Sequence, residues 1–238
     1  MATPAVRRSP APRPPAAPRV GGPLDPRTET PRADELVEDA DITGARWSGA
    51  DLDGVDLMSV RGRSVMAAQS VWQRSQCADV DLESADLAAS SWQDAGWRRV
   101  RLSECRATGI ELSGCMLEDV DITGCVLEMA RFRFATLRRV RFTGCRLTRA
   151  DFSSAQLEEV ALDDCLLEGA AFHQVRIQGR KVARNRRSGP GLVIRGGSIE
   201  GLAGPDQLRG AAIDPLHLEV LGGLLATAVG ISLDLPEE

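Results

Sequence analysis

The sequence predicts an all-β solenoid that ends in a capping α-helix, and three observations lead to this fold class. A five-residue repeat runs in one phase from residue 40 to residue 179. Within the repeat, charges alternate in sign at every fourth unit. One helical pattern follows near the C-terminus. The chain has 238 residues, of which 43% are hydrophobic and 4% aromatic, so small and branched side chains must fill its core.

Residues 1–39 differ from the rest of the chain in composition. They contain nine of the thirteen prolines, with six acidic and six basic residues. A segment with so little apolar area cannot offset the entropy lost on ordering, so we expect a disordered tail. We interpret the proline-rich stretch Pro10–Pro18 as a solvated leader. A role in binding a partner stays open, although no PxxP with a specific flank stands out.

The repeat of residues 40–179 comprises 28 units of five residues. The first position of each unit is Ala, Val, Ser, Cys or Ile, and the third position is never charged. Neither the two-residue period of a strand nor the 3.6-residue period of a helix places apolar residues at positions one and three of every five. A short fixed period is typical of a solenoid, in which each unit buries its apolar face by stacking on its neighbours.

Several units resemble the consensus of the pentapeptide-repeat family, which is a small residue, often Asp or Asn, then Leu or Phe, then two variable positions. Examples are Ala50-Asp51-Leu52, Ala85-Asp86-Leu87 and Ala150-Asp151-Phe152. The resemblance covers the whole of the repeat, from residue 40 to residue 179. It implies a right-handed quadrilateral β-helix with four units in each coil, and therefore about seven coils. With a spacing of about 4.8 Å between coils, the rod would be on the order of 34 Å long.

Two ladders of charged positions support a coil of four units independently of the resemblance. Residues four units apart stack directly in such a coil, so like charges should avoid that spacing. Each exposed pair contributes only about 0–1 kcal/mol, so the ladders set the register more than they stabilise the fold. The first ladder is Asp41, Arg61, Asp81, Arg101, Asp121 and Arg141. The second is Arg98-Arg99, Glu118-Asp119, Arg138-Arg139 and Glu158-Glu159.

Residues 180–213 break the phase of the repeat. The basic run Arg180–Arg187 is interpreted as a solvated loop, because no aromatic residues interleave it as they would in a nucleic-acid patch. The apolar residues that follow, within 192–202, are expected to form a degenerate last coil.

Residues 214–238 are expected to form a helix and a short tail. Asp214 is a suitable N-cap, Pro215 suits the first helical position, and Gly230 suits the C-terminal stop. The helix should cover the open end of the rod, since an uncapped solenoid exposes core and strand edges. This ending resembles the tail of many actinobacterial pentapeptide-repeat proteins, and in some family members such an element mediates dimerisation. The candidate cap or dimer face contains Leu216, Val220, Leu221, Leu224 and Leu225.

Residues that could carry chemistry are sparse. The six cysteines include no CxxC pair, and those at 105, 125, 145 and 165 should stack as small buried hydrophobes. His173 and His217 are expected at the surface, without a neighbouring nucleophile. Paired carboxylates lie on a convex rod that should offer no pocket in which a pKa could shift. The sequence therefore predicts no catalytic residue, no cofactor and no metal site.

Surface recognition remains as the expected function. The favoured hypothesis is a non-catalytic interaction module or scaffold with an unknown protein partner, and a homodimer through the C-terminal helix stays open. We expect a cytoplasmic protein, since no apolar stretch long enough for a membrane span or a secretory signal is present. The candidate partner surface is Met66, Val126, Met129, Phe134 and Leu166.

The resemblance also implies an alternative, because some pentapeptide-repeat proteins mimic DNA, bind DNA gyrase and confer fluoroquinolone resistance. A DNA mimic needs negative charge along the rod. The repeat has 21 acidic and 16 basic residues, and the ladders place Arg between the acids. That arrangement cancels the field, so binding to gyrase is the less favoured hypothesis, and we expect no direct contact with nucleic acid.

Overall fold

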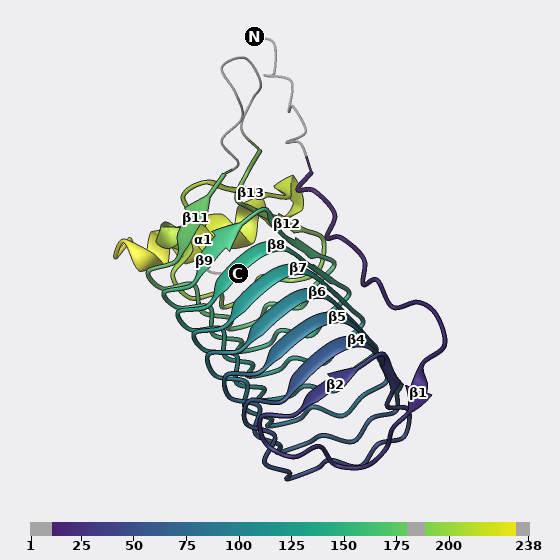
Figure 1. Cartoon of the computed structure of the whole chain (residues 1–238). Helices are drawn as coiled ribbons and strands as arrows, with labels where there is room; N and C mark the ends of the chain where they lie inside the picture. Colours follow the sequence, from purple (N-terminus) through teal and green to yellow (C-terminus); the bar gives the residue numbers. More distant parts are fainter. Residues whose placement is uncertain (1–10, 180–188, 232–238) are drawn as a thin grey trace.

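The computed structural model describes residues 11–179 and 189–231, and in it the chain winds into a solenoid of parallel strands (Figure 1). The solenoid has about eight turns, where the sequence predicted about seven, because residues on both sides of the in-phase repeat add to the stack. The predicted β-solenoid with a C-terminal helix is confirmed.

Strands of two lengths build the solenoid. The five long strands are β4 (Asp56–Arg63), β5 (Gln76–Glu83), β6 (Gly96–Ser103), β7 (Met116–Thr123) and β8 (Thr136–Thr143). The short strands are β1 (Asp25–Pro26), β2 (Leu36–Glu38), β3 (Ala40–Asp41), β9 (Gln156–Glu158), β10 (Val160–Asp163), β11 (Arg176–Gln178), β12 (Leu192–Arg195) and β13 (Ala211–Ile213). The helical elements are the 3₁₀ turns η1 (Pro205–Gln207) and η2 (Pro215–His217) and the helix α1 (Leu218–Ala228).

Each coil contacts the next along four walls. The long strands supply two of them, as in the pairs Leu57↔Cys77 and Arg61↔Asp81. Isolated bridges supply the other two, as in Arg46↔Met66 and Asp51↔Val71. In every one of these pairs the partners occupy the same position in units that lie four apart, so the predicted coil of four five-residue units is confirmed.

The fifth residue of most units turns the chain from one wall to the next. These residues have a positive φ, for example 74° at Gly44, 53° at Ala89 and 59° at Phe134. Glycine adopts this left-handed conformation freely, whereas for other residues it costs about 1–2 kcal/mol. The variable fifth position of the repeat therefore requires a left-handed backbone conformation. The non-glycine residues at this position adopt it at a cost in backbone strain.

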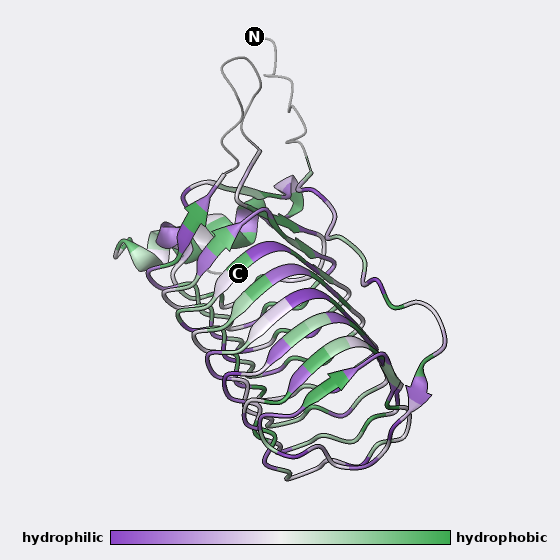
Figure 2. Cartoon of the chain, in the orientation of Figure 1, coloured by the Kyte–Doolittle hydropathy of each residue, from purple (hydrophilic) through white to green (hydrophobic). Residues whose placement is uncertain are grey.

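The first and third residues of the units are buried and form one continuous core. Figure 2 shows hydrophobic and hydrophilic residues following one another along the long strands. Trp72 is 2% exposed and is part of this core. Aromatic rings in successive coils stack on one another: Phe132 lies 4.7 Å from Phe152, and Phe152 lies 4.9 Å from Phe172. The four-unit period therefore orders the interior as well as the surface.

Residues 11–39 are not the disordered tail that composition predicted. Strand β1 pairs with β3, and β2 pairs with β4 through Leu36↔Asp56 and Val37↔Leu57. Val37 is completely buried, because the stacking register of the coils already applies before residue 40. Figure 1 shows the preceding residues running along the outside of the solenoid from its C-terminal end to β1.

Strand β12 belongs to a last full coil, and β13 stacks on β12 as the start of the next turn. Val160 pairs with Leu192 across a connection that is longer than a regular coil, and Leu192 pairs with Ala211. Bridges from Leu166 to Ser198 and from Ala171 to Ala203 complete this coil, which the sequence predicted within 192–202. The predicted basic run Arg180–Arg187 lies outside the described residues.

Asp214 was predicted to cap the C-terminal helix, but it caps the 3₁₀ turn η2, where its carboxylate accepts a hydrogen bond from the Leu216 N–H at 3.1 Å. The helix α1 begins only at Leu218. Its buried face differs from the prediction, because the first turn, η2, is a 3₁₀ turn whose three-residue period shifts Leu216 out of phase with α1. Leu216 is 81% exposed, whereas Leu221 and Leu224 pack partly against the core.

The same turn buries His217, which the sequence analysis placed at the surface. Its Nε2 lies 2.9 Å from the carbonyl oxygen of Gly196. His173 is exposed, as predicted. Across the described part of the chain, α1 and the other helical elements are too short or too polar to cross a membrane.

Candidate interaction surfaces

The first predicted charge ladder forms in the structure as a row of stacked partners. Asp41 pairs with Arg61, Arg61 with Asp81, Asp81 with Arg101, and Arg101 with Asp121, which in turn pairs with Arg141. The Arg101 Nη1 lies 3.5 Å from the Asp81 Oδ2. Opposite charges therefore face each other across successive coils, as the sign alternation requires.

The second predicted ladder also stacks. Its fifth-position residues, together with Asp79 of the preceding coil, form a more buried row of charges. We call Asp79, Arg99, Asp119, Arg139 and Glu159 the acid–arginine column. Arg99 contacts Asp79 at 2.5 Å, and Arg139 contacts Asp119 at 2.7 Å. These four side chains are only 13–17% exposed. Such pairs hold their side chains in one geometry better than exposed pairs do.

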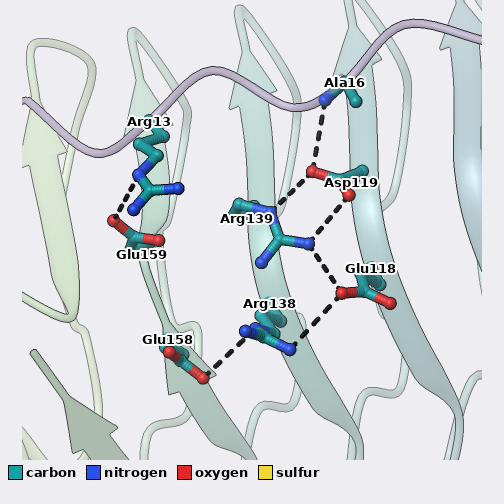
Figure 3. A network of polar contacts seen from close by, with 8 residues as sticks. All are labelled: Arg13, Ala16, Glu118, Asp119, Arg138, Arg139, Glu158 and Glu159. Atoms are coloured by element: carbon teal, nitrogen blue, oxygen red, sulfur yellow. Dashed lines mark hydrogen bonds and ion pairs between the residues drawn. The ribbon is translucent and has the colours of Figure 1, made fainter. Parts of the chain in front are cut away.

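The arginines lower the pKa of the column's aspartates. The hydrogen bond from Arg99 is the main cause of the lowered pKa of Asp79, and the hydrogen bond from Arg139 is the main cause for Asp119. Arg139 also contacts Glu118 at 2.6 Å, so that the fourth-position and fifth-position rows of the second ladder join in one network (Figure 3). Both aspartates therefore remain ionised well into mildly acidic solution.

Residues 11–20, which we call the strap, lie along this column. The backbone N–H of Ala16 donates to Asp119 Oδ1 at 3.2 Å, and the backbone N–H of Arg19 donates to Asp79 Oδ1 at 2.9 Å. Arg13 lies 3.9 Å from the carboxylate of Glu159. Figure 3 shows the strap crossing above Asp119 and Glu159.

The predicted partner surface is not a patch. Met66, Val126 and Leu166 share one wall, but charged residues separate them in the row Met66, Asp86, Arg106, Val126, Arg146, Leu166. Met129 and Phe134 are 51% and 61% exposed and occupy turns with positive φ. The ring of Phe134 lies under the Arg133 guanidinium, 5.6 Å away. Isolated apolar side chains of this kind are ordinary on protein surfaces.

A hollow on the solenoid wall corrects the expectation that a rod offers no pocket. It has a volume of about 500 Å³ and is lined by Met58, Cys77, Trp97 and Met116 around Gly96, together with carboxylates. Gly96 stacks between Gln76 and Met116, and the Gln76 side chain lies over the glycine and helps to line the hollow. The glycine at the second position of its unit is the signal in the sequence for this hollow.

The cysteines are free and buried, as predicted. Burial raises the pKa of the Cys77 thiol and raises the pKa of Cys115 to about 12. Such thiols stay protonated at neutral pH and are weak nucleophiles. Within residues 11–179 and 189–231, no three His, Cys, Asp or Glu side chains converge as metal ligands would.

Comparisons with known proteins found one family model and several solved structures that are similar to this chain. A family model described as "Pentapeptide repeat region" matches residues 115–186. Full-length QnrB1, a plasmid-mediated fluoroquinolone resistance protein, is 16% identical, with a TM-score of 0.32 over 81% of this chain and 91% of that one. HetL, involved in heterocyst differentiation regulation in Nostoc sp. strain PCC 7120, is 22% identical, with a TM-score of 0.27 over 74% and 86%. No curated protein matches the chain.

Proposed function

Because this chain is a pentapeptide-repeat protein, we propose that it acts as a non-catalytic interaction module that binds another protein through a wall of its solenoid. One observation carries the proposal: polar side chains stand in fixed rows along the walls and are held there by ion pairs between coils. Arg99 with Asp79 and Arg139 with Asp119 are examples that are largely shielded from solvent. Side chains ordered before binding lose less entropy when a partner arrives.

The chemistry of the buried groups supports a binding role over a catalytic one. The thiols of Cys77 and Cys115 have raised pKa values and therefore little thiolate character at neutral pH. His217 uses its Nε2 in a contact with a backbone carbonyl, and the exposed His173 lies on a turn in the last in-phase coil of the repeat. A nucleophile normally needs an adjacent general base, and these residues do not supply such a pair.

Binding to DNA gyrase as a DNA mimic is the competing proposal. It would need an uncompensated negative surface, because phosphate charge supplies much of the affinity of DNA-binding grooves. Here Arg63 pairs with Glu83, Arg131 with Glu111, and Arg138 with both Glu118 and Glu158. Pairing of this kind weakens the long-range field of the rod, which favours the interaction module.

A supercoiling assay separates the two proposals. Purified DNA gyrase is given relaxed plasmid, with and without a fluoroquinolone, and the full chain is added up to micromolar concentration. The interaction module is expected to leave both the supercoiling rate and the drug inhibition unchanged. Inhibition of gyrase or protection from the drug would overturn this ranking.

A capture experiment tests the interaction module directly. The immobilised full chain is compared with a Met66→Glu, Leu166→Glu variant, which changes the candidate partner surface, and with a Leu36→Glu variant, which changes an exposed apolar residue in β2, outside that surface. A partner that binds the predicted surface is retained by the native chain and the Leu36 variant and is lost from the Met66 and Leu166 variant. Equal recovery on all three would reject that surface.

We further propose that the C-terminal helix joins two copies of the chain. Leu216 and Leu218 are 81% and 67% exposed at the end of the solenoid, and Val229 is 64% exposed. Large apolar side chains exposed on one terminal element favour a covered interface. Leu216→Glu with Leu218→Glu should turn a dimer into a monomer in light scattering, whereas Thr227→Glu should not. A native chain that is monomeric at high concentration would refute the proposal.

A further inference from the structure

The strap contacts the acid–arginine column with a regular step. Its contact residues are Arg13, Ala16 and Arg19, each three residues after the one before. Their partners are Glu159, Asp119 and Asp79. Successive partners lie two coils apart, and the series runs toward the N-terminal end of the solenoid. Three strap residues therefore advance as far as two coils of the solenoid.

These two steps agree in length when the strap is an extended polyproline-type chain. Three residues of polyproline II rise about 9 Å and make one full turn. Two coils of the solenoid, at about 4.8 Å each, also advance by about 9.6 Å. A polyproline helix therefore presents the same face to the column at every second coil.

The prolines of the strap occupy the matching face. Pro12 is buried, and Pro15 and Pro18 are half-buried, whereas Pro14 and Ala17 between them are exposed. Proline has no backbone N–H, so a buried or half-buried proline leaves no donor unsatisfied. The remaining donors at Ala16 and Arg19 meet the carboxylates of the column. Side-chain packing and backbone hydrogen bonding thus follow the same three-residue period.

The column supplies what such a chain needs. Asp79 Oδ1 accepts both the N–H of Arg19 and the Nε–H of Arg99, at 2.9 and 2.6 Å, so the arginine fixes the acceptor in place. At the other end, Glu159 is only 7% exposed and its ion-pair partner is Arg13. A hollow of about 850 Å³ lies beside Arg13 and is lined by Arg138, Glu158 and Gln178 among others.

We propose that the acid–arginine column is a binding groove for extended, proline-rich segments that carry arginine, and that the strap is its intramolecular occupant. The proposal rests on the proposed function as an interaction module and names the surface and the chemistry of its partner. A partner segment of the same kind would have to displace the strap, which competes at the high effective concentration of a tethered ligand. The strap therefore lowers the apparent affinity of the groove for other segments.

Trypsin tests whether the strap is docked. Trypsin does not cleave before proline, so the bond after Arg13 is resistant and the bond between Arg19 and Val20 reports on the strap. In the native chain that bond should be cut at least tenfold more slowly than in a synthetic peptide of residues 11–24. An Asp79→Ala, Asp119→Ala variant should lose this protection.

An Asp81→Ala, Asp121→Ala variant is the matched control, since it removes two carboxylates of the first ladder from the same strands. It should keep the protection. Thermal melts of all variants must show a folded solenoid. Equal cleavage of the native chain and the peptide, or equal loss of protection in both variants, would overturn the proposal.

A labelled peptide tests whether the groove binds a segment in trans. Residues 9–22 are synthesised with fluorescein, and anisotropy is measured against the full chain and against a full-chain variant with Pro12→Gly, Pro15→Gly and Pro18→Gly. The loosened strap should let the peptide bind at least fivefold more tightly than to the native chain. A peptide with the same three glycines should bind at least fivefold more weakly than the native peptide.

The two outcomes of failure differ. The binding groove is rejected if the peptide binds the native and loosened chains equally. It is also rejected if Asp79→Ala with Asp119→Ala does not weaken binding of the peptide to the loosened chain. If the peptide behaves as expected and the capture experiment yields no partner, the groove stands and the interaction module is rejected.

Discussion

The indole of Trp72 lies parallel to the indole of Trp92 in the next coil, with ring centroids 4.5 Å apart and an interplanar angle of 5°. Each Nε1–H donates to a buried serine hydroxyl of its own coil, Ser70 at 2.7 Å and Ser90 at 2.9 Å. The first-position serines thus satisfy the polar atoms that the stacked tryptophans bring into the core.

Replacing one of these serines should therefore leave a buried indole N–H without an acceptor. Ser90→Ala is expected to lower the free energy of unfolding by about 1–3 kcal/mol, measured by guanidinium denaturation. The neighbouring Ser91→Ala, at a half-buried position on the wall, should change it by no more than about 0.5 kcal/mol. Equal effects of the two substitutions would contradict the role of the Ser90 hydroxyl.

The positive φ of the fifth positions predicts a stabilising glycine. Ala89 has a φ of 53°, so Ala89→Gly should raise the free energy of unfolding by about 0.5–1 kcal/mol through relief of backbone strain. The adjacent Ala88→Gly, at an ordinary φ, should lower it by a similar amount. Thermal denaturation of both variants checks the pair. Destabilisation by both would show that flexibility of the unfolded chain outweighs the strain.

The lowered pKa values of Asp79 and Asp119 predict acid sensitivity. Their pKa values in the folded chain lie below those in the unfolded chain. Their stabilisation is therefore complete above about pH 5 and is lost as the pH falls through and below about 4. Urea denaturation between pH 7 and pH 3 should show a shallower decline for Asp79→Asn with Asp119→Asn than for the native chain. Identical slopes would contradict the prediction.

Burial predicts that the six thiols are inaccessible in the folded chain. At pH 8 a thiol reagent should modify fewer than one cysteine per chain within an hour, and all six once guanidinium unfolds the protein. The variant Met116→Cys, whose native side chain is 62% exposed, should add one thiol that reacts at once. Rapid modification of several native cysteines would show that the solenoid opens readily.

The sequence predicted the coil and the core because repeat position alone decides burial. Phe172 and Cys165 are buried because they occupy the third and first positions, whatever their neighbours are. His217 was placed wrongly because a 3₁₀ turn, whose three-residue period the helical pattern does not reveal, sets its direction. Burial can thus be predicted from the position of a residue within the repeat, and it becomes ambiguous where the repeat ends.

The strap was not predictable by the same reasoning. Composition indicates correctly that residues 11–20 cannot form a core of their own. Their acceptors lie 60 residues away at Asp79 and 103 residues away at Asp119. The strap can be matched to these acceptors only by comparing its three-residue step with the two-coil step of the column. That comparison requires knowing which wall of the solenoid the strap follows.

The chain between Val160 and Leu192 is longer than any regular coil, yet these two residues pair and the stacking beyond them continues undisturbed. The pairing register of two strands in this molecule therefore depends on their position on the wall, and it does not depend on the length of the chain that connects them. A turn between two walls is thus a natural place for evolution, or a protein engineer, to graft a foreign sequence. The host would keep its shape while acquiring a new appendage.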